Sequence, residues 1–221
     1  MPLIDRARQS NLVHAHSTPQ EILRQVLTDQ RFGPTALVSA FGADSVALLH
    51  MVAEIDRSTP VIFVDTEMLF AETLDYQRSV ADHLGLTDVR VISPNRGALL
   101  VQDVDGLLHQ ADVDACCDLR RTAPMTTALQ GFETWISGRR QFRNGRSAAV
   151  PFFEKEDNAY RIRVNPLAQW TAGQVSDYID THDLPRHPLS EKGFQNLGCA
   201  PCSHRFGVGQ TGSIQPAQLA R

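Results

Sequence analysis

Short apolar runs alternate with helix-type segments along this chain, and that alternation restricts the fold more than any other feature. Residues 35–39 and 60–65 have the composition of buried strands, and residues 88–92 are predicted as a third strand. The helical patterns of residues 46–55 and 73–84 separate the three. Strands that alternate with helices form βαβ units, which place parallel strands in one sheet with helices on its faces. The sequence therefore predicts an α/β fold with a parallel sheet flanked by helices.

The remainder of the chain extends this pattern. Further strands are predicted at residues 135–137 and 160–164, and further helices at residues 120–129 and 171–181. Residues 18–21, Thr-Pro-Gln-Glu, have the pattern of a helix start with proline in the first turn. The predicted strands thus continue past the first three.

The length of the chain limits the number of domains, and its net charge limits the classes of partner. The 221 residues suit one domain, which we place at residues 1–202. Residues 203–221 are poor in apolar side chains and rich in Gly, Gln and Ser, so we predict a flexible tail there. The net charge of −4 argues against a nucleic-acid partner. Without a signal peptide or an apolar run of roughly 18 residues, a cytoplasmic protein with no membrane partner is expected.

Four cysteines form two close pairs, Cys116-Cys117 and Cys199-x-x-Cys202. Paired thiolates are typical of a shared metal or iron–sulfur site. Two disulfides are the alternative, but adjacent cysteines rarely bridge each other without strain, and the expected compartment is reducing. The spacing leaves zinc and a [4Fe–4S] cluster both open, with a slight preference for the cluster because adjacent cysteines are less usual around zinc.

Three loops after predicted strands carry residues suited to an anionic nucleotide. Residues 39–45 are small and precede a helix, whose amino terminus would attract a phosphate. Asp65 and Thr66 follow the next strand, where a carboxylate can accept from a ribose hydroxyl or cap a helix. Gly138 permits a sharp turn before Arg139 and Arg140, which are expected to project toward one anion because guanidinium groups match its oxygens.

Together these stretches resemble the assimilatory sulfonucleotide reductases, which act on adenylyl sulfate (APS) or phosphoadenylyl sulfate (PAPS). The resemblance spans roughly residues 35–202. The matching stretches lie at residues 39–45, 64–66, 69–73, 116–121, 137–140, 164–167, 184–189 and 198–202.

The resemblance implies a fold of the PP-loop nucleotide-hydrolase type and a preference for APS. It implies a [4Fe–4S] cluster held by Cys116, Cys117, Cys199 and Cys202. It also implies a substrate site whose residues are Ser39, Gly42, Asp44, Ser45, Asp65, Thr66, Arg121, Gly138, Arg139 and Arg140. Arg121 stands where relatives usually have a lysine.

The implied partner is a dithiol carrier, thioredoxin or glutaredoxin, and nothing in the sequence excludes a homo-oligomer. In the resembled family a cysteine in a Glu-Cys-Gly-x-His segment attacks the sulfate sulfur. This chain has no such segment, and its resemblance stops after Cys202. We therefore assign no catalytic residue. The interpretation is a frameshifted or truncated carboxyl terminus, and the 221-residue chain is expected to bind APS without releasing sulfite.

Two other functions remain open from the residues alone. A non-catalytic nucleotide- and cluster-binding protein would explain the missing fifth cysteine. An ATP-dependent RNA thiolase of the PP-loop type is the third hypothesis. Such enzymes typically carry Ser-Gly-Gly-x-Asp-Ser, from which residues 40–45 depart, and the acidic net charge argues against RNA.

Overall fold

A six-stranded sheet organises the computed structural model, which describes residues 3–143, 146–147, 150–156, 160–194 and 197–205. The strand order is β3-β2-β1-β4-β8-β7. All neighbouring pairs are parallel except β7 with β8. The strands are β1 (Thr35–Val38), β2 (Val61–Val64), β3 (Val89–Ile92), β4 (Thr134–Ile136), β7 (Phe153–Lys155) and β8 (Ile162–Val164). The short pair β5 (Phe142–Arg143) and β6 (Arg146–Ser147) forms a separate antiparallel ribbon.

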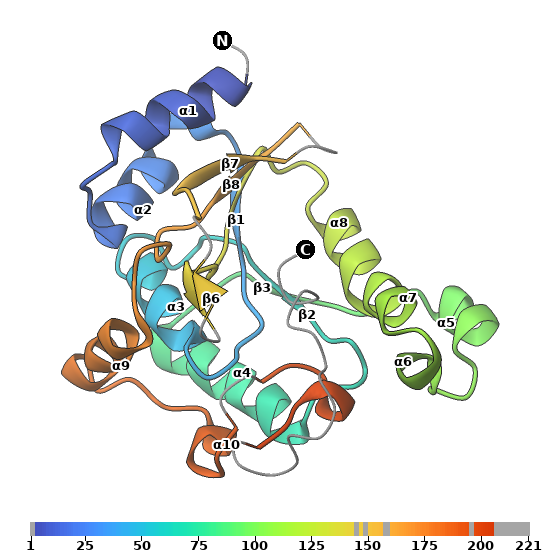
Figure 1. Ribbon diagram of the computed structural model, residues 1–221. Coiled ribbons are helices and arrows are strands. Elements are labelled where there is room, and N and C mark those ends of the chain that lie inside the picture. The colour runs from blue at the N-terminus through green and yellow to red at the C-terminus, as the bar shows by residue number, and fades with distance from the viewer. Residues whose placement is uncertain (1–2, 144–145, 148–149, 157–159, 195–196, 206–221) are drawn as a thin grey trace.

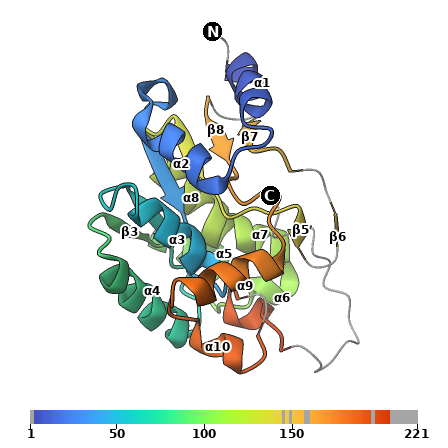
Figure 2. The ribbon, with the colours of Figure 1, turned by 90° about the vertical axis from the view of Figure 1, so that its left-hand side faces the viewer.

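Helices cover both faces of the sheet, but unequally (Figures 1 and 2). One face packs against α2 (Pro19–Thr28), α3 (Ser45–Ala53), α4 (Ala71–Leu84) and α9 (Ala172–Thr181). The opposite face packs against α8 (Ala123–Ala128) and the residues after it. The other helical elements are α1 (Leu3–Val13), η1 (Gln30–Phe32), α5 (Arg96–Gln102), α6 (Leu108–Ala111), α7 (Val113–Cys117), η2 (Asp118–Thr122), α10 (Pro188–Glu191) and η3 (Ala200–Cys202).

Side-chain alternation along the strands divides the apolar core between these two faces. Leu37 of β1 and Phe63 of β2 belong to the large cluster beneath α3 and α4. Ala36 and Ile62, one residue earlier on each strand, belong to the smaller cluster beneath α8. Because successive strand residues point to opposite faces, a continuous apolar run is what a strand covered on both sides requires. The sequence prediction of buried parallel strands is confirmed on this point.

The helix starts follow local rules. Thr18 accepts from the Glu21 N–H at 3.3 Å, and the Glu21 carboxylate accepts from the Thr18 N–H at 2.7 Å, which completes a capping box at α2. Thr171 and Gln174 form the same arrangement at α9. Both helices therefore begin where the sequence places them.

Two elements differ from the sequence predictions. The single helix expected at residues 120–129 is instead a π-helical turn, η2, followed by α8, so the chain after the cysteine pair is more widely wound. The antiparallel edge strand β7 was not predicted. The structure describes residues 203–205 of the expected tail, and Arg205 forms a bridge with Phe194. Residues 206–221 lie outside the described part of the chain.

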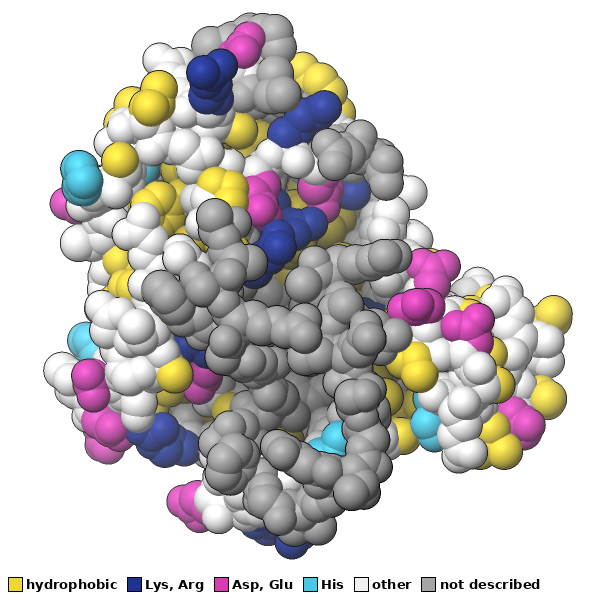
Figure 3. All heavy atoms as spheres, in the orientation of Figure 1, with side chains coloured by type: hydrophobic (Ala, Val, Ile, Leu, Met, Phe, Trp, Pro, Cys, Tyr) yellow, Lys and Arg dark blue, Asp and Glu magenta, His cyan; other side chains and the backbone are white. Residues whose placement is uncertain are grey.

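The segment from α5 to α7 projects from the body of the protein (Figure 1). Neither α5 nor α6 has a buried residue, and Leu100, Val101 and Val104 are 71%, 83% and 77% exposed. Figure 3 shows apolar and acidic side chains side by side on this projection. Within the described residues, no helix has the length and apolar character needed to cross a bilayer.

Candidate functional site

The three loops that were predicted to bind a nucleotide leave the sheet at one edge. β2, β1 and β4 are neighbouring parallel strands, so their carboxyl ends lie side by side. Ser39 follows β1, Asp65 follows β2 and Ser137 follows β4. Ligands of open parallel sheets bind at the carboxyl edge of the strands. The structure thus brings these three segments together at the edge where a nucleotide is expected.

The loop between β1 and α3 is held in shape by its own serines. The Ser39 hydroxyl accepts from the Phe41 N–H at 3.2 Å, and the Ser45 hydroxyl accepts from the Gly42 N–H at 3.0 Å. Phe41 has a φ of 46°, a left-handed conformation that costs a residue with a side chain about 1–2 kcal/mol. Its buried ring packs edge-on against Phe63, with 5.3 Å between centroids. Burial of that ring stabilises the strained loop and keeps it preformed.

The amino terminus of α3 lacks the cap that an aspartate at this position usually supplies. Asp44 is the N-cap residue, yet its side chain makes no capping hydrogen bond. Its carboxylate instead accepts from the guanidinium of Arg140. The first N–H groups of α3 are therefore without this side-chain partner, and together with the helix dipole they favour a bound anion.

Arg139 and Arg140 point to different partners, contrary to the expectation that both project toward one anion. Arg139 Nη1 donates to both carboxylate oxygens of Glu154 on β7, at 3.2 and 3.1 Å. Only Arg140 reaches the loop that precedes α3. Gly138 is exposed and is not in the left-handed region; a Cβ there would make an ordinary 3.8 Å contact with Leu48. The glycine is thus not required by backbone geometry.

Asp65 and Thr66 form the turn after β2. Asp65 Oδ1 accepts from the Glu67 N–H at 2.9 Å, and Glu67 has a φ of 58°, so the aspartate stabilises a tight turn. The buried Thr66 Oγ1 lies 3.2 Å from Cys199 Sγ. This contact joins the nucleotide edge of the sheet to a cysteine that is distant in sequence.

The two cysteine pairs are brought to the same region by different elements. Cys116 and Cys117 end α7, whereas Cys199 and Cys202 lie at the start and end of the η3 turn. The η3 turn is fixed by the Ala200 N–H, which donates to Met68 O at 2.7 Å, and by a bridge between Leu69 and Cys199. All four cysteines are free thiols, so the alternative of two disulfides is wrong.

Burial and the neighbouring thiols both affect the pKa values of the cysteines. Burial raises the pKa of Cys116 to about 11, and the charges of Cys117 and Cys199 add to that effect. Burial likewise raises the pKa of Cys202, again with contributions from Cys199 and Cys117. The pKa of Cys117 is raised by burial, and the nearby guanidinium of Arg121 partly opposes the rise.

The four thiols are sulfur donors of the kind that bind zinc or an iron–sulfur cluster. Among the described residues, no three His, Cys, Asp or Glu side chains are arranged to hold one metal ion. A zinc ion binds sulfur at about 2.3 Å and so requires its thiolates to touch one another. A [4Fe–4S] cube carries its irons at separate corners and accepts thiolates that are further apart. All four cysteines are free, so their thiolates have the donor chemistry of a [4Fe–4S] cluster and also of zinc.

A buried ion pair braces the cysteine-bearing segment, and the sequence analysis did not find it. Arg120 donates to Asp103 Oδ2 through Nε at 2.8 Å and Nη2 at 2.7 Å, and to Thr66 O through Nη1 at 3.0 Å. The Asp103 side chain is fully buried, and it also accepts from the Leu108 N–H at 2.8 Å. The neighbouring Val101 and Val104 are exposed, so nothing local marks Asp103 as buried, and only the fold reveals the pair.

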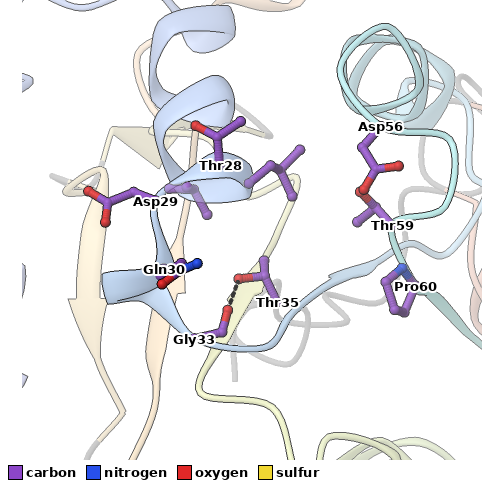
Figure 4. Close-up of a pocket in the computed structure, with 10 residues that line it drawn as sticks. Thr28, Asp29, Gln30, Gly33, Thr35, Asp56, Thr59 and Pro60 are labelled. Carbon is purple, nitrogen blue, oxygen red and sulfur yellow. Dashed lines mark hydrogen bonds between the residues drawn. The ribbon is translucent and has the colours of Figure 1, made fainter.

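A pocket of about 320 Å³ lies elsewhere, between α2 and the loop that precedes β2 (Figure 4). Thr35 and Pro60 line it at the amino ends of β1 and β2, so it occupies the edge of the sheet opposite the predicted nucleotide site. The Thr35 hydroxyl is already used, because it donates to Gly33 O at 3.1 Å. This pocket contains none of the predicted site residues.

Known proteins resemble the chain in both sequence and structure. A family model described as the phosphoadenosine phosphosulfate reductase domain matches residues 34–205. The adenosine 5'-phosphosulfate reductase of Mesorhizobium japonicum is 41% identical over 216 residues, which cover 98% of this chain and 81% of that protein.

Two solved structures support the fold. The phosphoadenylyl-sulfate reductase of Candida auris, crystallised with phosphate, aligns with a TM-score of 0.78 and 25% identity, and the match covers 90% of this chain and 97% of that one. Yeast FAD synthetase aligns with a TM-score of 0.57, and the match covers 90% of this chain and 75% of that protein's chain. At 15% identity, this match supports the fold alone. The expected PP-loop-like α/β fold is confirmed.

Proposed function

The chain belongs to the sulfonucleotide reductase family, and from that premise we propose that it binds APS at the carboxyl edge of β1, β2 and β4, beside a [4Fe–4S] cluster. One observation carries the proposal: the hydroxyl of Thr66 contacts Cys199 Sγ at 3.2 Å while Thr66 itself follows β2. The cysteines and the nucleotide loops therefore adjoin each other through a single residue. A site of that kind suits a substrate with an adenosine at one end and a sulfate at the other.

Each element of the edge has a role in this proposal. The loop of Ser39 to Ser45 and the amino terminus of α3 would receive the phosphosulfate, because backbone N–H groups and the helix dipole stabilise anions. Arg140 would add a guanidinium to the same group, and Asp65 would accept from a ribose hydroxyl. Arg121, which acts on the pKa of Cys117, would lie between the cysteines and the sulfate.

The cluster would be held by Cys116, Cys117, Cys199 and Cys202. When bound, it would supply a redox-active iron centre whose potential responds to nearby cations and hydrogen bonds. The chain's own contribution is to fix these ligands in place. The Arg120–Asp103 pair fixes the segment after Cys117, and the Thr66 hydroxyl fixes Cys199.

The reaction proposed for the family site is the reduction of APS to sulfite and AMP, as a step of sulfate assimilation. A thiolate attacks the sulfate sulfur, the bond from sulfur to the phosphate oxygen breaks, and AMP leaves with the bonding electrons. A dithiol carrier of the thioredoxin class then attacks the resulting S-sulfonate and releases sulfite. Its second thiol resolves the mixed disulfide, so the carrier is oxidised as sulfur is reduced.

The attacking thiolate must come from outside the four cysteines, because the proposal uses all four as ligands. The 221 residues contain no fifth cysteine. We therefore expect the 221-residue chain to bind APS and to transfer no sulfonate by itself. That same observation favours a second function, a nucleotide- and cluster-binding protein without catalysis, such as a sensor.

Single-turnover incubation tests the proposal. Protein purified without oxygen and loaded with its cluster is mixed with APS labelled at sulfur, and then with thioredoxin. We expect APS to bind, with no label on the protein and no sulfite released. Label on one of the four cysteines would contradict their assignment as cluster ligands. Failure to bind APS would contradict the proposed substrate.

A further inference from the structure

We propose that Asp44 is an internal counter-ion for Arg140, which the anionic end of the substrate displaces. Asp44 would then oppose anion binding, although the sequence analysis groups it with the residues that bind substrate. The inference rests on the proposed function in one respect, namely that an anion binds at the amino terminus of α3. It goes further by assigning opposite effects to two residues of that site.

Asp44 occupies the N-cap position of α3, but its side chain does not cap the helix. An aspartate at the N-cap position normally accepts from an N–H group of the first helical turn, which stabilises the helix by about 0.5–2 kcal/mol. Asp44 has helical rather than extended backbone dihedrals, makes no such hydrogen bond and pairs with Arg140. The carboxylate is therefore turned away from the N–H groups of α3 and toward a cation from the loop after β4.

Arg140 and Asp44 are buried to different extents. The side chain of Arg140 is only 8% exposed, whereas that of Asp44 is 49% exposed. A buried guanidinium needs an anionic partner, because an isolated buried charge is costly. The carboxylate, in contrast, can move into water at little cost. An incoming oxyanion can thus take over Arg140 while Asp44 turns to solvent.

Arg139, in the same loop, forms an ion pair with Glu154 that further contacts hold in place. Its partner Glu154 also accepts from Asn165 Nδ2 at 3.2 Å and lies 3.6 Å from the guanidinium of Arg163. Glu154 is thus held by several donors, and its side chain is 21% exposed, less than half the exposure of Asp44. Among the described residues, Arg140 has one weak additional hydrogen bond, to Thr171 O at 3.5 Å. Of the two arginines, Arg140 is the one able to exchange its partner.

The electrostatic consequence is a competition for one site. The helix amino terminus and Arg140 attract an anion, but the Asp44 carboxylate occupies Arg140 and repels a second negative charge. Replacing Asp44 by asparagine keeps the size of the side chain and removes both effects. The affinity for an anion should therefore rise, whereas loss of a true substrate contact would lower it.

The experiment measures dissociation constants by calorimetry for APS, AMP and inorganic sulfate, using cluster-loaded protein. The variants are Asp44→Asn, Arg140→Gln and the double variant. Asp44→Glu serves as the charge-conserving variant. Asp88→Asn is the matched control. Asp88 lies just before β3 and pairs with Arg90, at the edge of the sheet opposite the proposed anion site. Thermal unfolding of each variant confirms that it is folded.

We expect Asp44→Asn to tighten binding of all three ligands by up to about fivefold, because a partly exposed competing charge pair is worth at most about 1 kcal/mol. Asp44→Glu and Asp88→Asn should change affinity by less than about twofold. In the Arg140→Gln background, the Asp44→Asn effect should shrink to about twofold, because no guanidinium remains to be released.

Two results would overturn the inference. One is weaker binding in Asp44→Asn, which would make the carboxylate a substrate contact. The other is an equal gain with and without Arg140, which would reduce the effect to simple charge repulsion. A failure of the proposed function would look different: wild-type protein would not bind APS, while sulfate would still bind more tightly to Asp44→Asn.

Discussion

Removing the carboxylate of Asp103 should destabilise the protein strongly. The side chains of Asp103 and Arg120 are 0% and 7% exposed, and Asp103 receives two hydrogen bonds from the guanidinium and one from the Leu108 N–H. Asp103→Ala leaves the guanidinium buried with Thr66 O as its one remaining partner among the described residues. Breaking a buried ion pair by deleting one member costs about 3–5 kcal/mol. We expect a loss in that range.

Urea unfolding followed by circular dichroism measures the loss, with thiols kept reduced. Asp88→Ala is the control, because its pair with Arg90 is 34% and 46% exposed and should contribute at most about 1 kcal/mol. The double variant Asp103→Leu with Arg120→Met should recover much of the lost stability, since it leaves no unpaired charge. A loss below about 1 kcal/mol for Asp103→Ala would refute the argument, as would a double variant less stable than either single one.

Three further predictions concern stability. Burial lowers the pKa of His187 despite the opposing charge of Glu72, and His187 Nδ1 accepts from the Leu189 N–H. As the pH falls, the unfolded chain therefore takes up a proton at this histidine before the folded protein does. The stability of the folded protein should fall as the pH drops below about 6.5. In His187→Asn, unfolding followed from pH 8 to 5 should show a shallower slope, because His50, whose pKa burial also lowers, still contributes; an unchanged slope contradicts the assignment. Phe63→Ala should cost about 3–5 kcal/mol in urea unfolding, and a cost under about 1 kcal/mol would mean that the Phe41 loop does not depend on it. Thr18→Ala should cost about 1 kcal/mol through the lost capping box, and the Thr18→Ser variant should retain most of it.

The elements that the sequence predicted well are those fixed by local chemistry. Continuous apolar runs identify β1 and β2 because both faces of these strands are buried, whereas the edge strand β3 has exposed residues at Arg90 and Val91. Capping residues identify the starts of α2 and α9. The spacing of the cysteines indicates that both pairs serve one site, and the structure brings the thiols into electrostatic reach of one another.

The features that sequence reasoning missed depend on contacts between distant segments. Asp103 is buried only because Arg120, 17 residues later, folds back on it. Phe41 adopts a left-handed conformation because its ring is held against Phe63 on another strand. The divergence of Arg139 and Arg140 follows from Glu154, on an edge strand that the sequence did not predict. No local pattern encodes these pairings.

The central claim is that the cysteines and the nucleotide edge form one site. The most direct test is a titration of anaerobically purified protein with APS while the visible and Mössbauer spectra of its iron are recorded. We predict about four irons and four sulfides per chain, and a spectral change that saturates as APS binds. Protein that binds APS while holding no iron, or whose iron spectrum stays constant at saturation, would contradict a shared site.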